Sequence, residues 1–521
     1  MQLSLSFSAL LAGVLLAVSD VHAAPYARAP RTVTLPLKRM EARTSNVHPL
    51  ILHQQNVNRA SRRLARMAGR AEPSDAVLAD ALRKRVLSIE GPEGLERRRI
   101  GLAGAPKKDK RFNRTGVPSQ HDKRRAGKKG SKAGKGAAAA GAAGAAGAAG
   151  AAGTAGTAAA DSSAIGGADS ATGVEVANAP TAGNSLGLNI EGPDVGYLAT
   201  VQIGTPPVNY LILMDSGSAD FWVAGENCQS STTAGADCGN HQTLGATSSS
   251  SFVDTKAPFQ VEYGTGAVQG DIVTDNVVLA GLALNAHTFG VTTQETDDFA
   301  ADSVPFDGLM GLAQSTLSEQ QTLTPVESLA QQGLISDAIT SYKISRAADN
   351  LNDGEITFGG LDSTKFDAAT LTSFPNVNTQ GFWEGALDAV TVDGQDAGLQ
   401  GRTAILDSGT TLIVAPVADA TAVHQLITGS TADGQGGFTV PCTFNQSVAL
   451  TFGGTSFAID PRDIAVQPVN ANDPTGDCVS GISGGSFGTS DTEWLVGDVF
   501  LKNAYYSTDV GKNQIQLAKL V

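Results

Sequence analysis

Short alternating runs of apolar and polar residues dominate the chain from about Leu186 onward. Turn-forming Gly, Ser, Asn and Asp separate these runs, and each run has the length of one half-buried strand. We expect strands at 197–203, 210–214, 259–263, 272–279, 355–358 and 386–392. Helical periodicity is scarce, with one candidate at 325–332. The pattern predicts an all-β fold, and its length predicts two β lobes, 186–365 and 366–521.

The residues before this region differ from it in character. Residues 1–23 combine a short apolar stretch with a small-residue exit at Val21-His22-Ala23, which predicts a cleaved signal peptide rather than a retained anchor. Residues 24–125 are basic and mixed, and we interpret them as a propeptide. They contain one strand-like and two helix-compatible runs, at 32–37, 58–67 and 76–86.

A low-complexity segment follows the basic region. Ala-Ala-Gly repeats from Ala139 to Gly153, and glycine at every third position disfavours a helix. We therefore interpret 126–185 as a flexible linker, with the start of the mature protein left open. Dibasic pairs at Lys110-Arg111 and Arg124-Arg125 are alternative processing sites.

The net charge of −14 conceals a sharp division. Up to Lys135 there are 28 Lys and Arg against 10 Asp and Glu, and the remainder has 9 against 41. A basic segment can bind nucleic acid, but here an acidic domain of the same chain is the nearer partner. Since carboxylates lose charge at low pH, the two parts would attract at neutral pH and separate in acid. We expect an acid-triggered precursor with its own basic segment as intramolecular inhibitor.

The four cysteines fit disulfides in a secreted chain. Three connectivities are possible, and we favour Cys228 with Cys238 and Cys442 with Cys478 because each closes a loop within one half. Metal binding is the weaker interpretation, since there is no Cys-x-x-Cys and His241 is the only histidine near a cysteine.

An internal repeat carries the candidate chemistry. Asp215-Ser-Gly-Ser and Asp407-Ser-Gly-Thr each follow an apolar strand, and each is matched by a later apolar run that ends in glycine, Gly311 and Gly497. Two such turns facing each other would bring the two carboxylates together. They would share one proton, so that one could activate a water while the other polarises a peptide carbonyl.

The residues around each aspartate fit this task. Gly217 and Gly409 permit a tight turn, while Ser218 and Thr410 place hydroxyls within reach of the carboxylates. Competing motifs are poorer. Gly-x-Ser-x-Gly occurs at 481–485 and 484–488 without the strand and helix of a nucleophile elbow, and His287 and His424 lack a nucleophile context. No metal-ligand cluster is present, and we expect no cofactor.

On these motifs residues 190–521 resemble the pepsin family of aspartic proteases, especially fungal members. The resemblance lies in two active-site segments, a flap hairpin, the segments behind each aspartate and the cysteine positions: 215–223, 404–412, 261–266, 306–313, 494–500 and the four cysteines. It implies a bilobal double β-barrel fold, with the active-site cleft between pseudo-symmetric lobes. It also implies a secreted or vacuolar acid endopeptidase, made as a zymogen and acting on proteins or peptides.

The resemblance further implies roles for single residues. Tyr263 would close over substrate with Trp222 supporting its hydroxyl, while Gly264, Thr265 and Thr411 would contact substrate. Leu213, Phe306 and Leu309 would wall an apolar pocket, although each also fits plain core.

Two departures from the family and several further expectations complete the sequence-based picture. Both triplets are Asp-Ser-Gly where Asp-Thr-Gly is commoner, and Thr265 replaces an aspartate that helps some fungal relatives to accept lysine. Asn445 and Asn113 lie in glycosylation sequons. We expect a monomer with no membrane or nucleic-acid partner. The rival to an enzyme is a catalytically inactive binding or inhibitor protein of the same fold.

Overall fold

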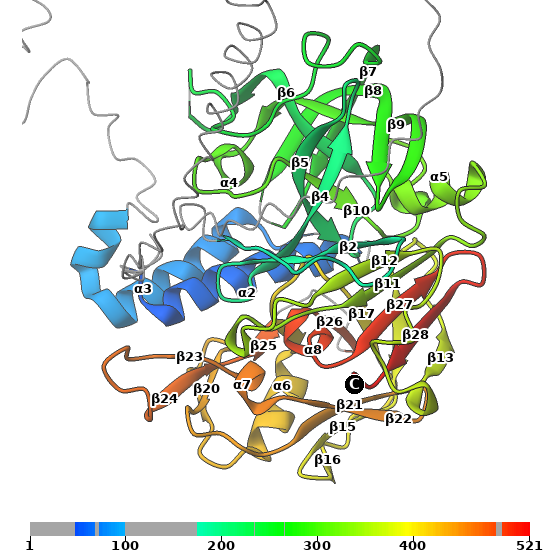
Figure 1. Ribbon diagram of the computed structural model, residues 1–521. Coiled ribbons are helices and arrows are strands. Elements are labelled where there is room, and N and C mark those ends of the chain that lie inside the picture. Colours follow the sequence, from blue (N-terminus) through cyan, green and yellow to red (C-terminus); the bar gives the residue numbers. More distant parts are fainter. Residues whose placement is uncertain (1–46, 68–71, 99–173, 234, 265, 486–491) are drawn as a thin grey trace, which may run out of the picture. The chain divides into compact units, whose positions relative to one another are not determined.

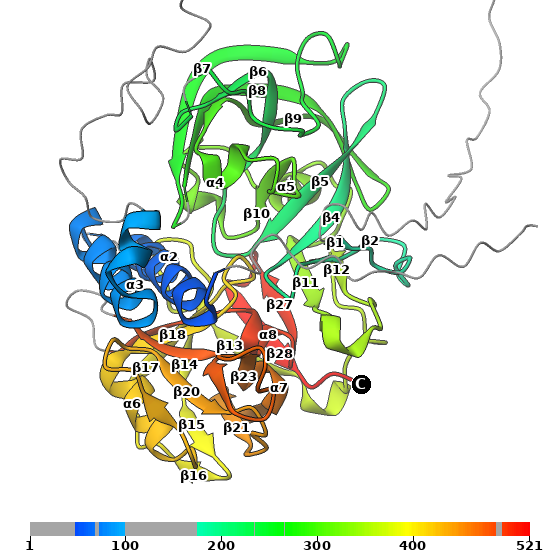
Figure 2. The same ribbon diagram turned by 90° about the vertical axis from the view of Figure 1, so that its left-hand side faces the viewer.

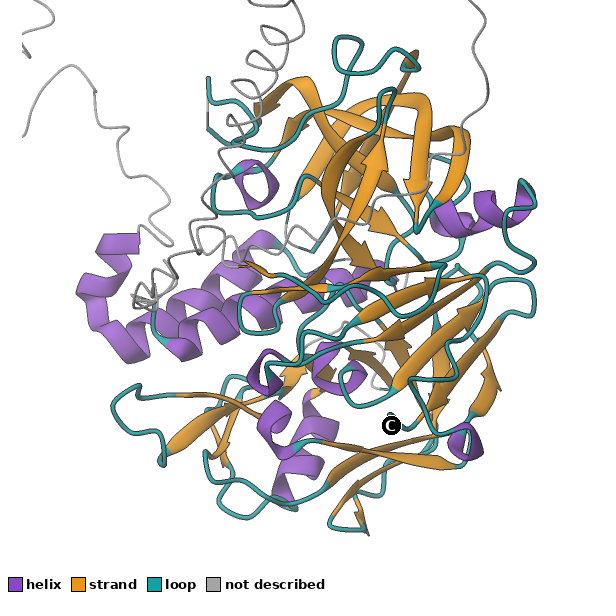
Figure 3. Cartoon of the chain, in the orientation of Figure 1, coloured by secondary structure: helices purple, strands orange, loops and turns teal. Residues whose placement is uncertain are grey.

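Strands dominate the chain from residue 174 onward, which confirms the all-β fold (Figure 3). The computed structural model describes residues 47–67, 72–98, 174–233, 235–264, 266–485 and 492–521. For 96–98 it describes the backbone alone. All of them belong to one compact unit, Thr44–Val521. The signal peptide, the run at 32–37, both dibasic pairs, Asn113, Thr265 and most of the linker lie outside the described residues.

The first half forms a nine-stranded sheet in the order β1-β3-β4-β5-β10-β6-β9-β8-β7 (Figure 1). An additional pairing of β4 with β8 closes six of these strands into a barrel. The strands are β1 (Val174–Glu175), β3 (Asn189–Glu191), β4 (Gly196–Ile203), β5 (Val208–Asp215), β6 (Phe221–Ser230), β7 (Val253–Glu262), β8 (Ala267–Leu279), β9 (Leu282–Glu295) and β10 (Gly308–Gly311). The helices are α4 (Asp297–Ala300), η2 (Ser315–Leu317) and α5 (Pro325–Gln331).

A six-stranded sheet in the order β13-β28-β27-β11-β12-β2 takes strands from both halves. Because β27 of the second half pairs with β11 of the first, this sheet ties the halves together. Its strands are β2 (Ser185–Gly187), β11 (Ile339–Lys343), β12 (Glu355–Phe358), β13 (Thr372–Pro375), β27 (Tyr505–Asp509) and β28 (Gln514–Ala518). The strand β1 lies within the segment 126–185 that composition assigns to the linker.

The second half holds three smaller sheets, ordered β14-β17-β26-β18-β25, β16-β15-β21-β22 and β19-β20-β24-β23. The strands are β14 (Glu384–Leu387), β15 (Ala389–Val392), β16 (Gln395–Asp396), β17 (Arg402–Leu406), β18 (Ile413–Pro416), β19 (Thr431–Ala432), β20 (Phe438–Pro441), β21 (Val448–Phe452), β22 (Thr455–Ile459), β23 (Ala465–Pro468), β24 (Asp477–Ser480), β25 (Ile482–Gly485) and β26 (Glu493–Val496). The helices of this half are η4 (Ala368–Thr370), α6 (Val417–Gln425), α7 (Pro461–Ile464) and α8 (Asp498–Leu501), whereas η3 (Ala347–Asp349) belongs to the first half, between β11 and β12.

The expected strands form, with one correction. The run 386–392 is not a single strand, because β14 pairs with β17 while β15 pairs with β21. The chain therefore changes sheets at Asp388. The helix expected at 325–332 is α5, which a capping box at Thr324 and Glu327 stabilises at its start.

The basic region contributes two helices, α2 (Pro49–Met67) and α3 (Asp75–Arg98), where two helix-compatible runs are predicted. Gly91, with φ 67°, and Pro92 kink α3. Both helices lie between the two groups of β-strands (Figures 1 and 2). Val57, Leu64 and Met67 of α2 are buried and join the hydrophobic cluster that extends through both halves. The helix is therefore packed as part of the core.

Covalent and membrane features complete the fold. Cys228 is bonded to Cys238 and Cys442 to Cys478, which confirms the predicted pairing. No helix within the described ranges is both long and apolar enough to cross a membrane.

Candidate active site

The two Asp-Ser-Gly turns occupy equivalent places in the two halves. Asp215 is the last residue of β5. This strand runs parallel to β10, in which Gly311 lies opposite Asp215. Asp407 directly follows β17, which runs parallel to β26. Both predicted partner segments therefore lie beside their aspartates. Both carboxylates are fully buried.

A reciprocal hydrogen-bond network joins the two turns. The backbone N–H of Ser216 donates to Oγ of Ser408 at 3.0 Å, and the N–H of Ser408 donates to Oγ of Ser216 at 2.9 Å. Each hydroxyl then donates to a backbone carbonyl of the opposite half, from Ser216 to Leu406 at 3.2 Å and from Ser408 to Met214 at 2.9 Å. These two serines were not among the predicted site residues. The repeat of Asp-Ser-Gly is the signal that could have identified them.

Each carboxylate is held in place by its own turn. Ser218 Oγ donates to Asp215 Oδ2 at 2.5 Å, and Thr410 Oγ1 donates to Asp407 Oδ2 at 2.7 Å. The backbone N–H groups of Gly217 and Gly409 donate to Oδ1 of their own aspartates, both at 2.9 Å. The four predicted supporting residues therefore fix the orientation of both carboxylates.

The carboxylates of Asp215 and Asp407, which we call the dyad, lie close together between the two halves. A methyl group on Gly217 would collide with the carboxylate of Asp407, and one on Gly409 with that of Asp215. Burial raises the pKa of Asp407; Arg63 lowers it, and the charge of Asp215 raises it. Two buried carboxylates in this arrangement cannot both ionise easily without a cation, so they can share a proton.

That cation is Arg63 of α2. Its guanidinium forms ion pairs with both aspartates, and Nη2 donates to Asp407 Oδ1 at 2.8 Å. Burial alone would lower the pKa of Arg63, but the two carboxylates raise it. In the described chain the space over the dyad is thus occupied by the basic region.

The expected flap is the hairpin of β7 and β8. Nε1 of Trp222 donates to the hydroxyl of Tyr263 at 2.8 Å, and both side chains are buried. Phe299 packs edge-on against both rings. Gly264 lies against the backbone carbonyl of Arg59 in α2, and a Cβ there would clash with it. The helix therefore lies where the flap would meet a substrate.

A cavity of about 240 Å³ lies beside the dyad. The three predicted wall residues line it together with the flap tyrosine: Leu213, Phe306, Leu309 and Tyr263. Gly264, Gly409, Thr410 and Thr411 also reach it. Phe299 completes the apolar wall and escaped prediction, because it lies in a Thr-Asp-Asp-Phe run without strand alternation. The cavity is also lined by charged residues and by α2, including Arg59, Glu191 and Asp298. Its apolar wall is a suitable place for a hydrophobic side chain.

The remaining candidates are placed without a catalytic arrangement. His287 and His424 are buried, and burial lowers the pKa of each to about 4. Ser483 of the Gly-x-Ser-x-Gly segment lies in β25 and shares a hydrogen bond with His53 of α2 at 2.7 Å. Among the described residues, one group has metal-like spacing, Glu295 with Cys228 and Cys238, but these cysteines form a disulfide. Asn445 is exposed.

Comparisons with known proteins agree with this geometry. The family model for eukaryotic aspartyl protease matches residues 196–520. A probable aspartic-type endopeptidase CTSD of Trichophyton verrucosum is 36% identical over 345 residues, which cover 66% of this chain and 65% of that protein. The aspartic-type endopeptidase ctsD of Aspergillus fumigatus is 36% identical over 349 residues, which cover 66% of this chain and 70% of that protein. Cathepsin D of Dictyostelium discoideum is 31% identical over 332 residues, which cover 63% of this chain and 84% of that protein. The match thus spans slightly less than two thirds of the Trichophyton relative.

Proposed function

Since the chain belongs to the eukaryotic aspartyl protease family, we propose that it is an aspartic endopeptidase whose catalytic carboxylates are Asp215 and Asp407. The observation that carries the proposal is the pair of buried carboxylates facing each other, each held by a hydroxyl and a backbone N–H of its own turn.

The proposed reaction needs only these two groups and a water molecule. The ionised carboxylate takes a proton from the water, whose oxygen attacks the peptide carbonyl carbon. The protonated carboxylate donates to the carbonyl oxygen. The tetrahedral intermediate then collapses and the C–N bond breaks: one of its hydroxyl groups returns a proton to the ionised carboxylate, and the leaving amine takes a proton from the protonated one, which restores the singly protonated pair. The proton is shared, so its pKa values belong to the pair rather than to either residue.

Substrate would lie in the cleft beside the dyad. The cavity lined by Leu213, Phe306 and Leu309 supports a preference for large hydrophobic side chains at the scissile bond. Tyr263 and Gly264 of the flap, together with Thr411, would contact the substrate. A substrate contact for Thr265 and a glycan on Asn445 remain proposals from the sequence.

We further propose that the chain is a secreted or vacuolar zymogen. Arg63 forms ion pairs with both aspartates and α2 lies against the flap, so residues 47–98 would exclude substrate at neutral pH. In acid the carboxylates take up protons, the ion pairs weaken, and the basic segment would leave the cleft. The released enzyme would act as a monomer.

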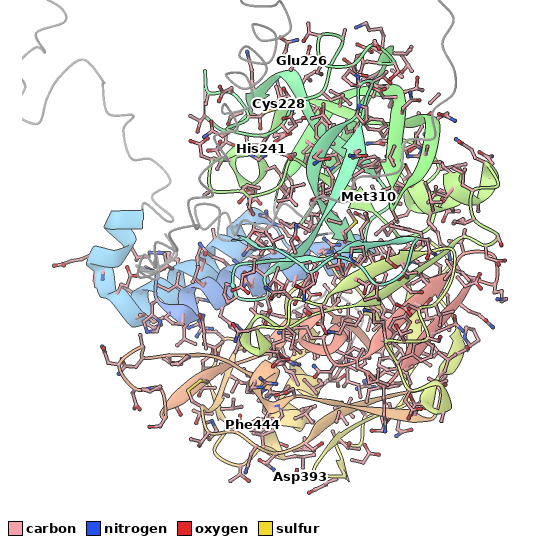
Figure 4. All side chains as sticks on the ribbon, in the orientation of Figure 1. Glu226, Cys228, His241, Met310, Asp393 and Phe444 are labelled. Carbon is pink, nitrogen blue, oxygen red and sulfur yellow. A yellow bond between two sulfur atoms is a disulfide. The ribbon has the colours of Figure 1, made fainter. Side chains whose placement is uncertain are left out.

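The test is hydrolysis of a peptide with two adjacent hydrophobic residues by acid-treated protein. The test compares two variants of the dyad, Asp215→Asn and Asp407→Asn, with the control variant Asp393→Asn. Asp393 lies on the β15–β16 hairpin, far from α2 (Figure 4). We expect cleavage by the wild type and Asp393→Asn, sensitivity to pepstatin, and loss of cleavage in both other variants. A folded wild type that cleaves nothing would favour the inactive binding protein instead.

A further inference from the structure

Away from the dyad, a shielded carboxylate of the catalytic part, Asp433, binds an arginine of the basic region. Arg85 of α3 forms an ion pair with Asp433, with Nη2 at 2.6 Å from Oδ2. The Arg85 side chain is 3% exposed and that of Asp433 is 13% exposed. Nη2 of Arg85 also donates to Oε1 of Gln54 in α2 at 3.1 Å. Because this pair is shielded from water, the attraction between its two charges is screened less than in an exposed surface ion pair, and loss of one partner would leave the other charge uncompensated.

The catalytic part orients Asp433 by itself. Oδ1 accepts hydrogen bonds from the backbone N–H groups of Gln435, at 2.7 Å, and Gly437, at 3.0 Å. The turn is tied to β25, where the N–H of Gly484 donates to the carbonyl of Gly436 at 2.7 Å. Oδ2 faces Arg85 and has no other polar partner within the described chain. Removal of α3 would therefore leave the carboxylate in place with one oxygen unpaired.

The position of Asp433 relative to the dyad follows from α2. Gln54 lies at the Arg85–Asp433 pair, and its neighbour His53 contacts Ser483 of β25. Arg63 of the same helix lies on the dyad. Nine residues of helix at 1.5 Å each span about 14 Å. An extended peptide covers this distance in roughly four or five residues.

From this arrangement we propose that, once residues 47–98 have left, Asp433 is a specificity subsite for an arginine or lysine side chain of the substrate, roughly four or five residues from the scissile bond. The inference rests on the proposed protease function and names a further feature of its substrates. Arg85 shows the chemistry of the ligand, because it already places a guanidinium on the free oxygen of Asp433. The site is distinct from the apolar cavity beside the dyad, where Asp433 is not among the lining residues.

The experiment uses acid-processed protein and a peptide series with a hydrophobic pair at its centre. A single arginine replaces alanine in turn at the third to sixth positions on either side. We expect the wild type to cleave one or two neighbouring arginine peptides with about tenfold higher kcat/KM than the alanine peptide, chiefly through KM. Asp433→Asn, which keeps the turn acceptor but removes the charge, should lose this preference and cleave the alanine peptide normally. Asp393→Asn should behave as the wild type.

A second measurement does not depend on any variant. Citrulline, the neutral isostere of arginine, at the preferred position should lower kcat/KM to the alanine value. Equal cleavage of arginine, citrulline and alanine peptides by the wild type would overturn the subsite, and Asp433 would then be an anchor for the basic region only. A preference that persists in Asp433→Asn would also overturn it. Cleavage of no peptide, including the alanine peptide, would reject the proposed function and the subsite with it.

Discussion

Ser216 and Ser408 hold each other across the two halves of the molecule, since the backbone N–H of each donates to the side-chain hydroxyl of the other. Both serines are buried, and each immediately follows one of the two aspartates. The distance between the carboxylates therefore depends on this pair of hydrogen bonds. A small displacement of one turn would separate the two groups that must share a proton.

Replacement of either serine by alanine tests this relationship. Ser216→Ala leaves the N–H of Ser408 without its acceptor and removes one of the two hydrogen bonds to the carbonyl of Leu406, so we expect a loss of about 1–3 kcal/mol in the free energy of unfolding. We also expect a large fall in kcat. Ser216→Thr keeps the hydroxyl and should retain both properties. Thermal unfolding and peptide hydrolysis measure them, and an active, fully stable Ser216→Ala would contradict the role.

Arg63→Gln tests the block over the dyad. The substitution removes the cation that pairs with two buried carboxylates, so we expect docking of α2 to weaken by about 3 kcal/mol or more. The precursor should then become active at a higher pH than the wild type. Arg62→Gln is the matched control, because Arg62 pairs with the exposed Asp75. Identical activation profiles for both variants and the wild type would exclude Arg63 as the block.

His53 predicts part of the pH dependence of activation. Burial, together with Arg85 and His424, lowers the pKa of His53 to about 4, while the charge of Asp433 acts in the opposite direction. A released His53 takes up its proton near its ordinary pKa of 6.5, whereas the docked residue stays neutral to about 4. The contribution of neutral His53 to docking of α2 is therefore fully present above pH 6.5. It is lost as the pH falls toward 4, and the loss is on the order of 3 kcal/mol.

His53→Gln removes this proton uptake and can still reach Ser483. We expect its precursor to activate at lower pH and over a narrower range than the wild type, measured as the pH of half-maximal activation. His48→Gln, at the half-exposed start of the helix, should change activation much less. No shift in His53→Gln would assign the pH response to the carboxylates alone.

Trp222→Phe tests the support of the flap. The variant loses the hydrogen bond to the buried hydroxyl of Tyr263, and we expect kcat/KM to fall about tenfold. Tyr263→Phe loses the same bond from the other side. If the bond is what matters, the double variant should be little worse than either single one. Additive losses would show that the two rings act separately.

The sequence predicts what depends on neighbouring residues. Asp215 and Asp407 could be identified because each lies in a short motif after an apolar strand, and Ser218 and Thr410 reach the carboxylates within the same turn. The disulfides close local loops and follow the same logic.

What the sequence could not predict depends on contacts between distant residues. The repeat of Asp-Ser-Gly marks Ser216 and Ser408 as equivalent positions, but their mutual hydrogen bonds form only when the two halves come together. Arg63 is one of many basic residues, and only the docking of α2 shows which of them reaches the dyad. The run 386–392 alternates like one strand, but its two parts pair in different sheets. Tertiary pairing decides such cases, and local pattern does not.

The most direct measurement follows casein digestion by purified precursor as the pH is lowered from neutral to acidic, with and without pepstatin, beside Asp407→Asn. Our account predicts no digestion at neutral pH, activity that appears in acid together with loss of residues 47–98, inhibition by pepstatin, and no activity in the variant. Digestion at neutral pH by the intact precursor would contradict the block by α2. A processed and folded chain without activity at any pH would contradict the catalytic pair itself.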